Sequence, residues 1–146
     1  MKIGISACLL GDKVRYDGSG KANKQLIELL EKHETVKICP EVSAGFPIPR
    51  SPIEIMNDKV KNKDGEDLTD KLYQGSYECF EKIKDCDFVI LKTKSPSCGY
   101  GQIYDGTFSG RLIKGDGIFT QLCLKNNIRV FTETQIDDII NTLKGD

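Results

Sequence analysis

Short apolar runs alternate with helix-length amphipathic segments along the chain, and this alternation restricts the architecture that the chain can adopt. The runs are typical of buried strands, and the segments between them carry apolar residues at helical spacing. We expect strands at 2–7, 36–38, 88–91 and 128–131, a short extended piece at 102–104, and helices at 23–30, 68–84, 117–125 and 134–143. Strands that alternate with helices form parallel βαβ units. The sequence therefore predicts an α/β fold with a parallel sheet of about four to five strands and flanking helices.

Size and charge restrict the function classes. The chain has 146 residues, which predicts a single domain over 1–146. It carries 21 basic and 22 acidic residues, for a net charge of −1, which argues against a broad binding surface for nucleic acid and favours a small-molecule partner. No apolar run approaches the roughly 20 residues that span a bilayer. We expect a cytoplasmic protein with no membrane partner.

Two segments do not fit the strand–helix alternation. Residues 39–50 contain three prolines, which argue against a helix or a central strand and predict an ordered loop. Such loops in compact domains are often functional. Residues 57–67 are polar and charged, and we expect a flexible excursion there.

The six cysteines form two groups. Cys79, Cys86 and Cys123 lie in or beside helical patterns among apolar neighbours, whereas Cys8, Cys39 and Cys98 each follow a predicted strand among Gly, Pro and Ser. Because a parallel sheet brings the carboxyl ends of its strands to one edge, we expect the second group to meet there. Its wide spacing resembles neither ferredoxins nor zinc ribbons, so the pattern leaves three interpretations open: ligands of one iron–sulfur cluster, small buried thiols, or one nucleophile.

Three polar side chains accompany these cysteines. Glu41 follows Cys39 by two residues, and Ser95 and Ser97 precede Cys98. Glu41 could act as a general acid or base, or could cap a backbone amide; the serines could donate hydrogen bonds to a substrate, or could simply form a turn. Three thiolate ligands would leave one metal position free for a substrate.

Motifs along almost the whole chain resemble the thiouracil desulfidase-like family. They are Ser6-Ala-Cys-Leu-Leu-Gly11, Val14-Arg-Tyr-Asp-Gly18, Cys39-Pro-Glu41 with Pro49-Arg50, Ser95-Pro-Ser-Cys-Gly99 and Tyr104-Asp-Gly-Thr-Phe-Ser-Gly110. The resemblance implies a Rossmann-like, three-layer domain that carries a [4Fe-4S] cluster. It also implies a non-redox, hydrolytic reaction in which water replaces the sulfur of a thiolated pyrimidine base or nucleotide and sulfide is released.

Carried onto this chain, the resemblance assigns roles to individual residues. It implies Cys8, Cys39 and Cys98 as cluster ligands, and Glu41, Ser95 and Ser97 as catalytic residues, without saying which serine acts. Arg15, Tyr16 and Asp17 match a substrate-binding motif. We expect iron–sulfur assembly machinery as a further partner, because a cluster of this kind has to be supplied.

Two functions of other classes compete with this one. The chain could be a non-catalytic iron–sulfur carrier or sensor, or a cluster-free cysteine hydrolase with one reactive thiolate. The only histidine, His33, lies in a charged stretch and offers no partner for such a thiolate, which argues against the hydrolase.

Overall fold

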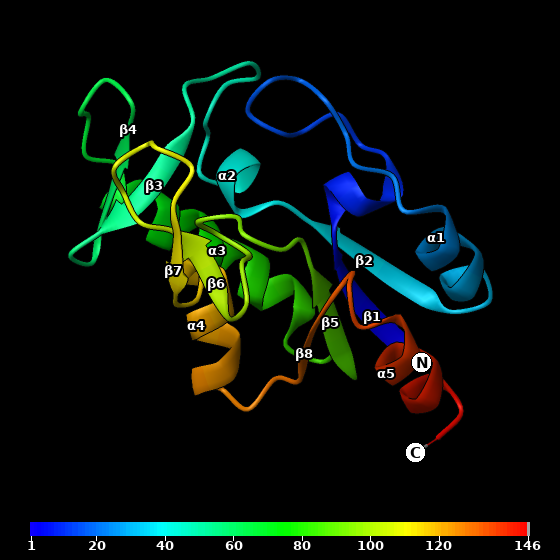
Figure 1. The fold of residues 1–146 in the computed structure, drawn as a ribbon. Coiled ribbons are helices and arrows are strands. Elements are labelled where there is room, and N and C mark those ends of the chain that lie inside the picture. The colour runs from blue at the N-terminus through cyan, green and yellow to red at the C-terminus, as the bar shows by residue number, and fades with distance from the viewer. Residues whose placement is uncertain (146) are drawn as a thin grey trace.

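A four-stranded parallel sheet forms the centre of the protein, as Figure 1 shows for the computed structural model, which describes residues 1–145. Its strand order is β2-β1-β5-β8. The strand that comes first in the sequence, β1, is therefore an inner strand with β2 on one side and β5 on the other. The strands are β1 (Lys2–Ser6), β2 (Glu34–Ile38), β5 (Phe88–Leu91) and β8 (Val130–Thr132). The predicted α/β architecture is confirmed.

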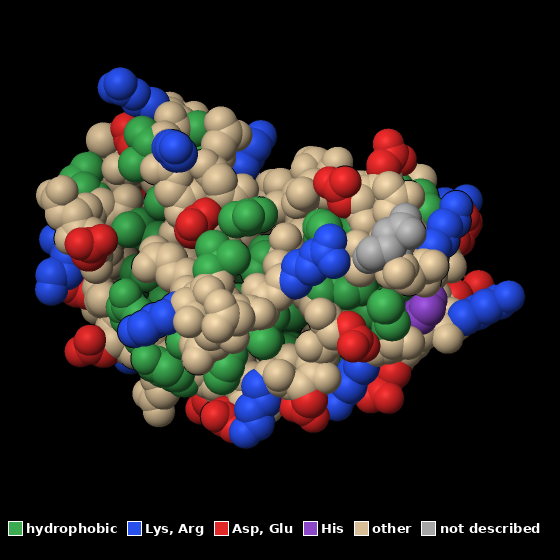
Figure 2. Space-filling model, turned by 90° about the horizontal axis from the view of Figure 1, so that it is seen from below, with side chains coloured by type: hydrophobic (Ala, Val, Ile, Leu, Met, Phe, Trp, Pro, Cys, Tyr) green, Lys and Arg blue, Asp and Glu red, His purple; other side chains and the backbone are tan. Residues whose placement is uncertain are grey.

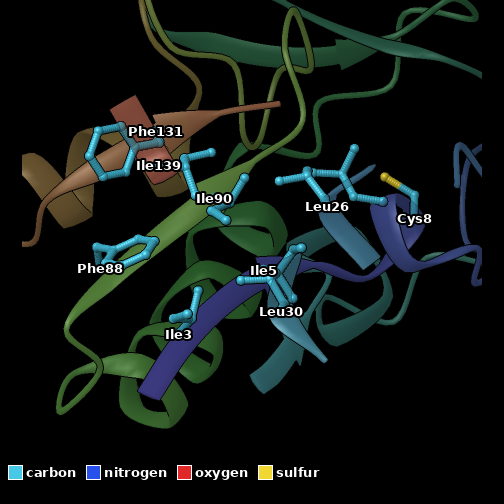
Figure 3. Packing of buried hydrophobic residues seen from close by; sticks show 10 residues of the cluster. Ile3, Ile5, Cys8, Leu26, Leu30, Phe88, Ile90, Phe131 and Ile139 are labelled. Atoms are coloured by element: carbon cyan, nitrogen blue, oxygen red, sulfur yellow. The ribbon is translucent and has the colours of Figure 1, made fainter. Parts of the chain in front are cut away.

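Helices cover both faces of the sheet and complete three layers. One core cluster joins Ile5 and Ile90 of the sheet to α1 (Lys24–Leu30) and α5 (Ile136–Leu143), as the labelled side chains of Figure 3 show. A second cluster on the opposite face joins the sheet to α3 (Thr69–Ile83) and α4 (Ile118–Lys125). The two apolar clusters explain why strands 88–91 and 130–132 are buried along their whole length.

The helix starts are set by local chemistry. The side chain of Asn23 accepts a hydrogen bond from the backbone N–H of Leu26 at 3.1 Å and so caps the start of α1. The helix expected at 134–143 begins later, because the N-cap of α5 is Gln135. The hydroxyl of Thr134 shares a hydrogen bond with Thr132 at 2.7 Å, within the turn that precedes the helix.

Two antiparallel hairpins lie together beside the main sheet, on the left of Figure 1. They are β3 (Ile53–Met56) with β4 (Lys59–Asn62), and β6 (Gln102–Tyr104) with β7 (Leu112–Lys114). The extended piece at 102–104 was expected, whereas β7 was not. Ile53, Ile55 and Ile103 pack with the start of α3 in a third core cluster.

The structure corrects two expectations about irregular segments. Residues 57–67 are not a flexible excursion, because Asn57 and Asp58 adopt φ values of 52° and 62° and close the β3–β4 hairpin with a two-residue turn. Residues 39–50 are not entirely a loop, because Pro40–Ser43 form one helical turn, α2. Pro40 occupies its first position, where a missing N–H costs no hydrogen bond.

The short helix α2 lies against α3 at a glycine. A Cβ atom at Gly75 of α3 would overlap the carbonyl oxygen of Pro40 and the backbone nitrogen of Ala44. The absence of a side chain at Gly75 therefore lets the two helices approach closely and fixes the backbone that carries Glu41. None of the helices within 1–145 is both long enough and apolar enough to cross a membrane.

Candidate functional site

Three cysteines from three adjacent strands of the sheet line one cavity. Cys8 lies in the 3₁₀ turn η1 (Ala7–Leu10) directly after β1, Cys39 follows β2, and Cys98 lies in the loop after β5. All three contribute to the walls of a cavity of about 400 Å³. Figure 3 shows Cys8 at the edge of the core cluster, beyond Leu26. The structure therefore brings together the three cysteines that the sequence analysis singled out.

The donor set is chemically suited to an iron–sulfur cluster. Within residues 1–145, no group of three or more His, Cys, Asp or Glu side chains is placed to hold one ion. Three thiols without a histidine are also the ligand chemistry of such clusters rather than of magnesium or calcium sites.

Burial raises the pKa of each of these three thiols above the usual value of a cysteine. Burial, with a smaller contribution from the neighbouring Cys39, raises the pKa of Cys8 to about 11. Burial also raises the pKa of Cys39 and raises that of Cys98 well above its usual value. A reactive cysteine needs a lowered pKa. The environment therefore argues against a cluster-free cysteine hydrolase, whereas a metal can deprotonate its ligands on binding.

The other three cysteines are packed in the core. Cys79, Cys86 and Cys123 belong to the apolar cluster between the sheet and the helices α3 and α4, and none of them lines the cavity. The Sγ atom of Cys79 lies 3.3 Å from the hydroxyl of Ser43. Burial raises the pKa of Cys123 to about 12, so this thiol behaves as a small apolar side chain.

Glu41 lies in the same cavity and its two carboxylate oxygens have different partners. Oε1 accepts hydrogen bonds from Nε and Nη2 of Arg50 at 3.2 and 3.1 Å. Oε2 accepts a hydrogen bond from the hydroxyl of Ser97 at 3.0 Å. The ion pair is largely shielded from solvent, with side-chain exposures of 6% for Arg50 and 13% for Glu41. One oxygen is thus fixed by a cation and the other faces a hydroxyl.

Arg50 also ties together two loops around the cavity. Its Nη2 donates to the carbonyl oxygen of Val14 at 2.9 Å, and its backbone N–H donates to the carbonyl oxygen of Tyr16 at 2.7 Å. The sequence analysis included Arg50 in a motif but gave it no role. Its partner carboxylate is nine residues away, and only the folded loop brings the two together.

The two serines beside Cys98 share a hydrogen bond between their hydroxyl groups at 2.9 Å, but their other partners differ. The hydroxyl of Ser95 accepts the backbone N–H groups of Ser97 at 3.1 Å and Cys98 at 2.9 Å, so it shapes the loop that holds the cysteine. The hydroxyl of Ser97 reaches Glu41. The backbone of this loop is further fixed by α4, because Phe119 donates to the carbonyl oxygen of Ser97 at 2.8 Å.

Only two of the three residues in the predicted substrate-binding motif line the cavity. Arg15 and Tyr16 line the cavity, whereas Asp17 does not. The exposed carboxylate of Asp17 accepts hydrogen bonds from the hydroxyl and the backbone N–H of Ser19, and these bonds lower the pKa of Asp17. Asp17 therefore holds the shape of the loop that presents its two neighbours.

A second ion pair borders the cavity and was not foreseen. Lys92, the residue after β5, lines the cavity, and its Nζ lies 3.2 Å from Oε2 of Glu133. The same carboxylate accepts the backbone N–H of Thr93 at 2.9 Å. Lys92 is close enough to Cys8 to oppose the rise in the pKa of that thiol. In the sequence, the position of Lys92 directly after a predicted strand was the feature that could have indicated its place at the cavity.

Comparisons with known proteins agree on one family. The model of the 2-thiouracil desulfurase family matches residues 3–135. The uncharacterized protein YbbK of Bacillus subtilis (strain 168) is 36% identical over 148 residues, which cover 93% of this chain and 98% of YbbK. The solved structure of the [4Fe-4S]-dependent thiouracil desulfidase TudS is 37% identical, with a TM-score of 0.91 over 98% of this chain and 97% of that chain. The chain therefore belongs to the 2-thiouracil desulfurase family.

Proposed function

We propose that this protein is a [4Fe-4S]-dependent desulfidase that hydrolyses a thiolated pyrimidine base or nucleotide and releases sulfide. The observation that carries the proposal is the convergence of Cys8, Cys39 and Cys98 on one cavity that also holds the Glu41–Ser97 pair. The similarity to TudS over nearly the full length of both chains supports the same activity.

Cys8, Cys39 and Cys98 would hold the cluster. Among the described residues that line the cavity, there is no histidine and no fourth cysteine, and the carboxylate of Glu41 is engaged by Arg50 and Ser97. The cluster, when bound, supplies an iron that no protein thiolate occupies, a Lewis acid with an affinity for thiocarbonyl sulfur.

Glu41 and Ser97 would transfer protons during the reaction. Replacing a thiocarbonyl by a carbonyl breaks a carbon–sulfur bond, forms a carbon–oxygen bond from water, and transfers the two protons of water to the departing sulfide. Because Arg50 holds Oε1, proton exchange is expected at Oε2, where the hydroxyl of Ser97 lies at 3.0 Å. Burial of this pair beside the cysteines keeps bulk water from competing for the same oxygen.

Two alanine variants test whether Ser95 and Ser97 have different roles. Ser97→Ala removes a hydrogen bond to a charged group, and we expect kcat for sulfide release to fall about 10- to 100-fold with the iron content unchanged. Ser95→Ala removes the acceptor for the N–H groups of Ser97 and Cys98, and we expect it to lower the iron content instead. Iron analysis and sulfide assays on both variants check this. Equal effects of the two changes on both readouts would contradict the assignment.

The function itself is tested by sulfide release. The protein is purified and reconstituted with iron and sulfide without oxygen, freed of excess sulfide, and mixed with 2-thiouracil, 4-thiouracil or their nucleotides. We expect stoichiometric formation of sulfide and the corresponding oxo-pyrimidine, with no requirement for an electron donor. Failure of the cluster-loaded protein to desulfurate any of these compounds would contradict the proposed function.

A further inference from the structure

Among residues 1–145, the polar side chains of the buried residues are all hydroxyl groups. On the face drawn in Figure 2, basic and acidic side chains lie at the surface among apolar ones. The buried hydroxyls belong to Ser6, Ser76, Ser97, Thr120, Thr132 and Thr142. A hydrogen bond left unmade in the interior is costly, so the partners of each buried hydroxyl indicate what holds it there.

Only two of these hydroxyls, those of Ser6 and Ser97, line the cavity. The two threonines nearest the C-terminus bond to groups at most four residues away along the chain. The hydroxyls of Ser76 and Thr120 have no hydrogen-bond partner among the described residues, and they lie outside the cavity lining. Ser97 donates its proton to Glu41. Ser6 is therefore the buried hydroxyl of the cavity whose proton has no assigned acceptor.

Ser6 is held rigidly between the two inner strands of the sheet. It is the last residue of β1 and is 4% exposed. Its hydroxyl oxygen accepts the backbone N–H of Lys92, the residue directly after β5, at 3.0 Å. A hydroxyl that accepts one hydrogen bond still has its own proton to donate. The structure thus fixes the oxygen of Ser6 at the edge of the sheet that carries the cysteines and leaves its proton available.

The acceptor beside this proton is the sulfur of Cys98. Burial raises the pKa of Cys98 well above its usual value, and a hydrogen bond with the side chain of Ser6 opposes this rise. Ser97 also lies beside the sulfur, but its proton is directed to Oε2 of Glu41 at 3.0 Å. A hydrogen bond that lowers the pKa of a thiol stabilises its thiolate, which is the form that binds metal.

A donor to a ligand sulfur changes the electronic properties of the metal that the sulfur binds. The reduction potential of an iron–sulfur cluster depends on hydrogen bonds to its sulfur atoms, and groups behind the ligands tune a metal site in general. Such a bond draws electron density away from the sulfur, so the iron receives less of it. The iron then becomes a stronger Lewis acid, and the cluster becomes easier to reduce and harder to oxidise.

We propose that the hydroxyl of Ser6 donates a hydrogen bond to the sulfur of Cys98 and thereby raises the reduction potential of the cluster and the Lewis acidity of its iron. Ser6 acts through Cys98, so it is a positioning residue rather than a catalytic one. The inference rests on the part of the proposed function that places a cluster on Cys98. The proposed reaction consumes no electrons, and the potential serves here as a measure of the electron density at the iron.

The reduction potential of the reconstituted cluster tests the inference without turnover. The unaltered protein and Ser6→Ala are titrated with a chemical reductant in the absence of oxygen, and electron paramagnetic resonance follows the reduced cluster. Alanine removes the donor and fits the same buried space. We expect Ser6→Ala to keep its iron, and the equilibrium constant for reduction to fall about tenfold, a shift of about 59 mV to more negative potential for one electron. An unchanged potential would overturn the inference.

Ser43→Ala provides the matched control. The hydroxyl of Ser43 also lies beside a cysteine sulfur, 3.3 Å from Sγ of Cys79, but neither residue lines the cavity. Its loss should leave the potential unchanged, and Ser6→Thr, which keeps a hydroxyl, should preserve the potential as well. A shift in Ser43→Ala as large as that in Ser6→Ala would overturn the inference, because the effect would then not depend on a proposed ligand.

A second measurement uses the unaltered protein alone, so the inference stays testable if Ser6→Ala binds no iron. The proton of Ser6 is exchangeable, and resonance Raman bands of the bonds between iron and cysteine sulfur should therefore shift when the cluster-loaded protein is transferred to deuterated water. The absence of a shift would overturn the inference and leave the proposed function intact. An unaltered protein that binds no cluster would contradict the proposed function, and this inference with it.

Discussion

Replacement of Glu41 by glutamine is expected to lower kcat for sulfide release by about 10²- to 10⁴-fold, the range typical of lost general acid–base catalysis. Glutamine keeps the shape of the side chain and an acceptor for Arg50, but its amide cannot take up and return a proton. The change therefore removes proton transfer while preserving the contacts that hold α2 in place. Anaerobic sulfide assays with excess thiopyrimidine measure the effect.

The cluster must be shown to survive this change. Iron content and visible absorbance of Glu41→Gln should match those of the unaltered protein, because Glu41 is not one of the proposed ligands. A variant that keeps its cluster and its full rate would contradict the role of Glu41. A non-catalytic iron–sulfur carrier predicts a different result, namely no turnover of any thiolated pyrimidine before or after the substitution.

Replacement of Arg50 by methionine is expected to reduce the free energy of unfolding by about 3–5 kcal/mol, as for other buried ion pairs that lose one partner. The carboxylate of Glu41 would remain in a site where its own exposure is 13%, and the carbonyl oxygens of Val14 and Pro47 would lose a donor. Urea unfolding of the purified variant under anaerobic conditions measures the change.

Two further variants test whether the unpaired charge of Glu41 causes the loss of stability in Arg50→Met. Lys84→Met breaks the pair between Lys84 and Glu81, whose side chains are 54% and 66% exposed, and should leave the free energy of unfolding nearly unchanged. The double variant Arg50→Met/Glu41→Gln should recover much of the lost stability, because the unpaired charge is gone. A cost for Arg50→Met as small as that of the surface pair would show that the Glu41–Arg50 contact does not organise the site.

The main sheet and the meeting of the cysteines could be predicted from the sequence. Strand 88–91 is a continuous apolar run, and the helical spacing on either side predicts the parallel connections. Once the strands are parallel, residues that follow them share one edge, so Cys8, Cys39 and Cys98 meet even though they are far apart in sequence.

The walls of the cavity could not be predicted in the same way. The β3–β4 hairpin turns on Asn57 and Asp58 without the glycine that usually signals such a turn, and its polar sequence resembles a mobile loop. Lys63 reaches the cavity only because this hairpin is ordered. The pairing of Glu41 with Arg50 likewise depends on the path of a loop that no periodicity describes.

Iron content of the reconstituted protein and of single cysteine variants tests the central claim most directly. We expect about four iron atoms per chain in the unaltered protein, and a loss of the cluster absorbance with Cys8→Ala, Cys39→Ala or Cys98→Ala. Cys79→Ala should retain the iron, because this buried thiol lies outside the cavity. Retention of the full cluster by Cys98→Ala, or its loss from Cys79→Ala alone, would contradict the account.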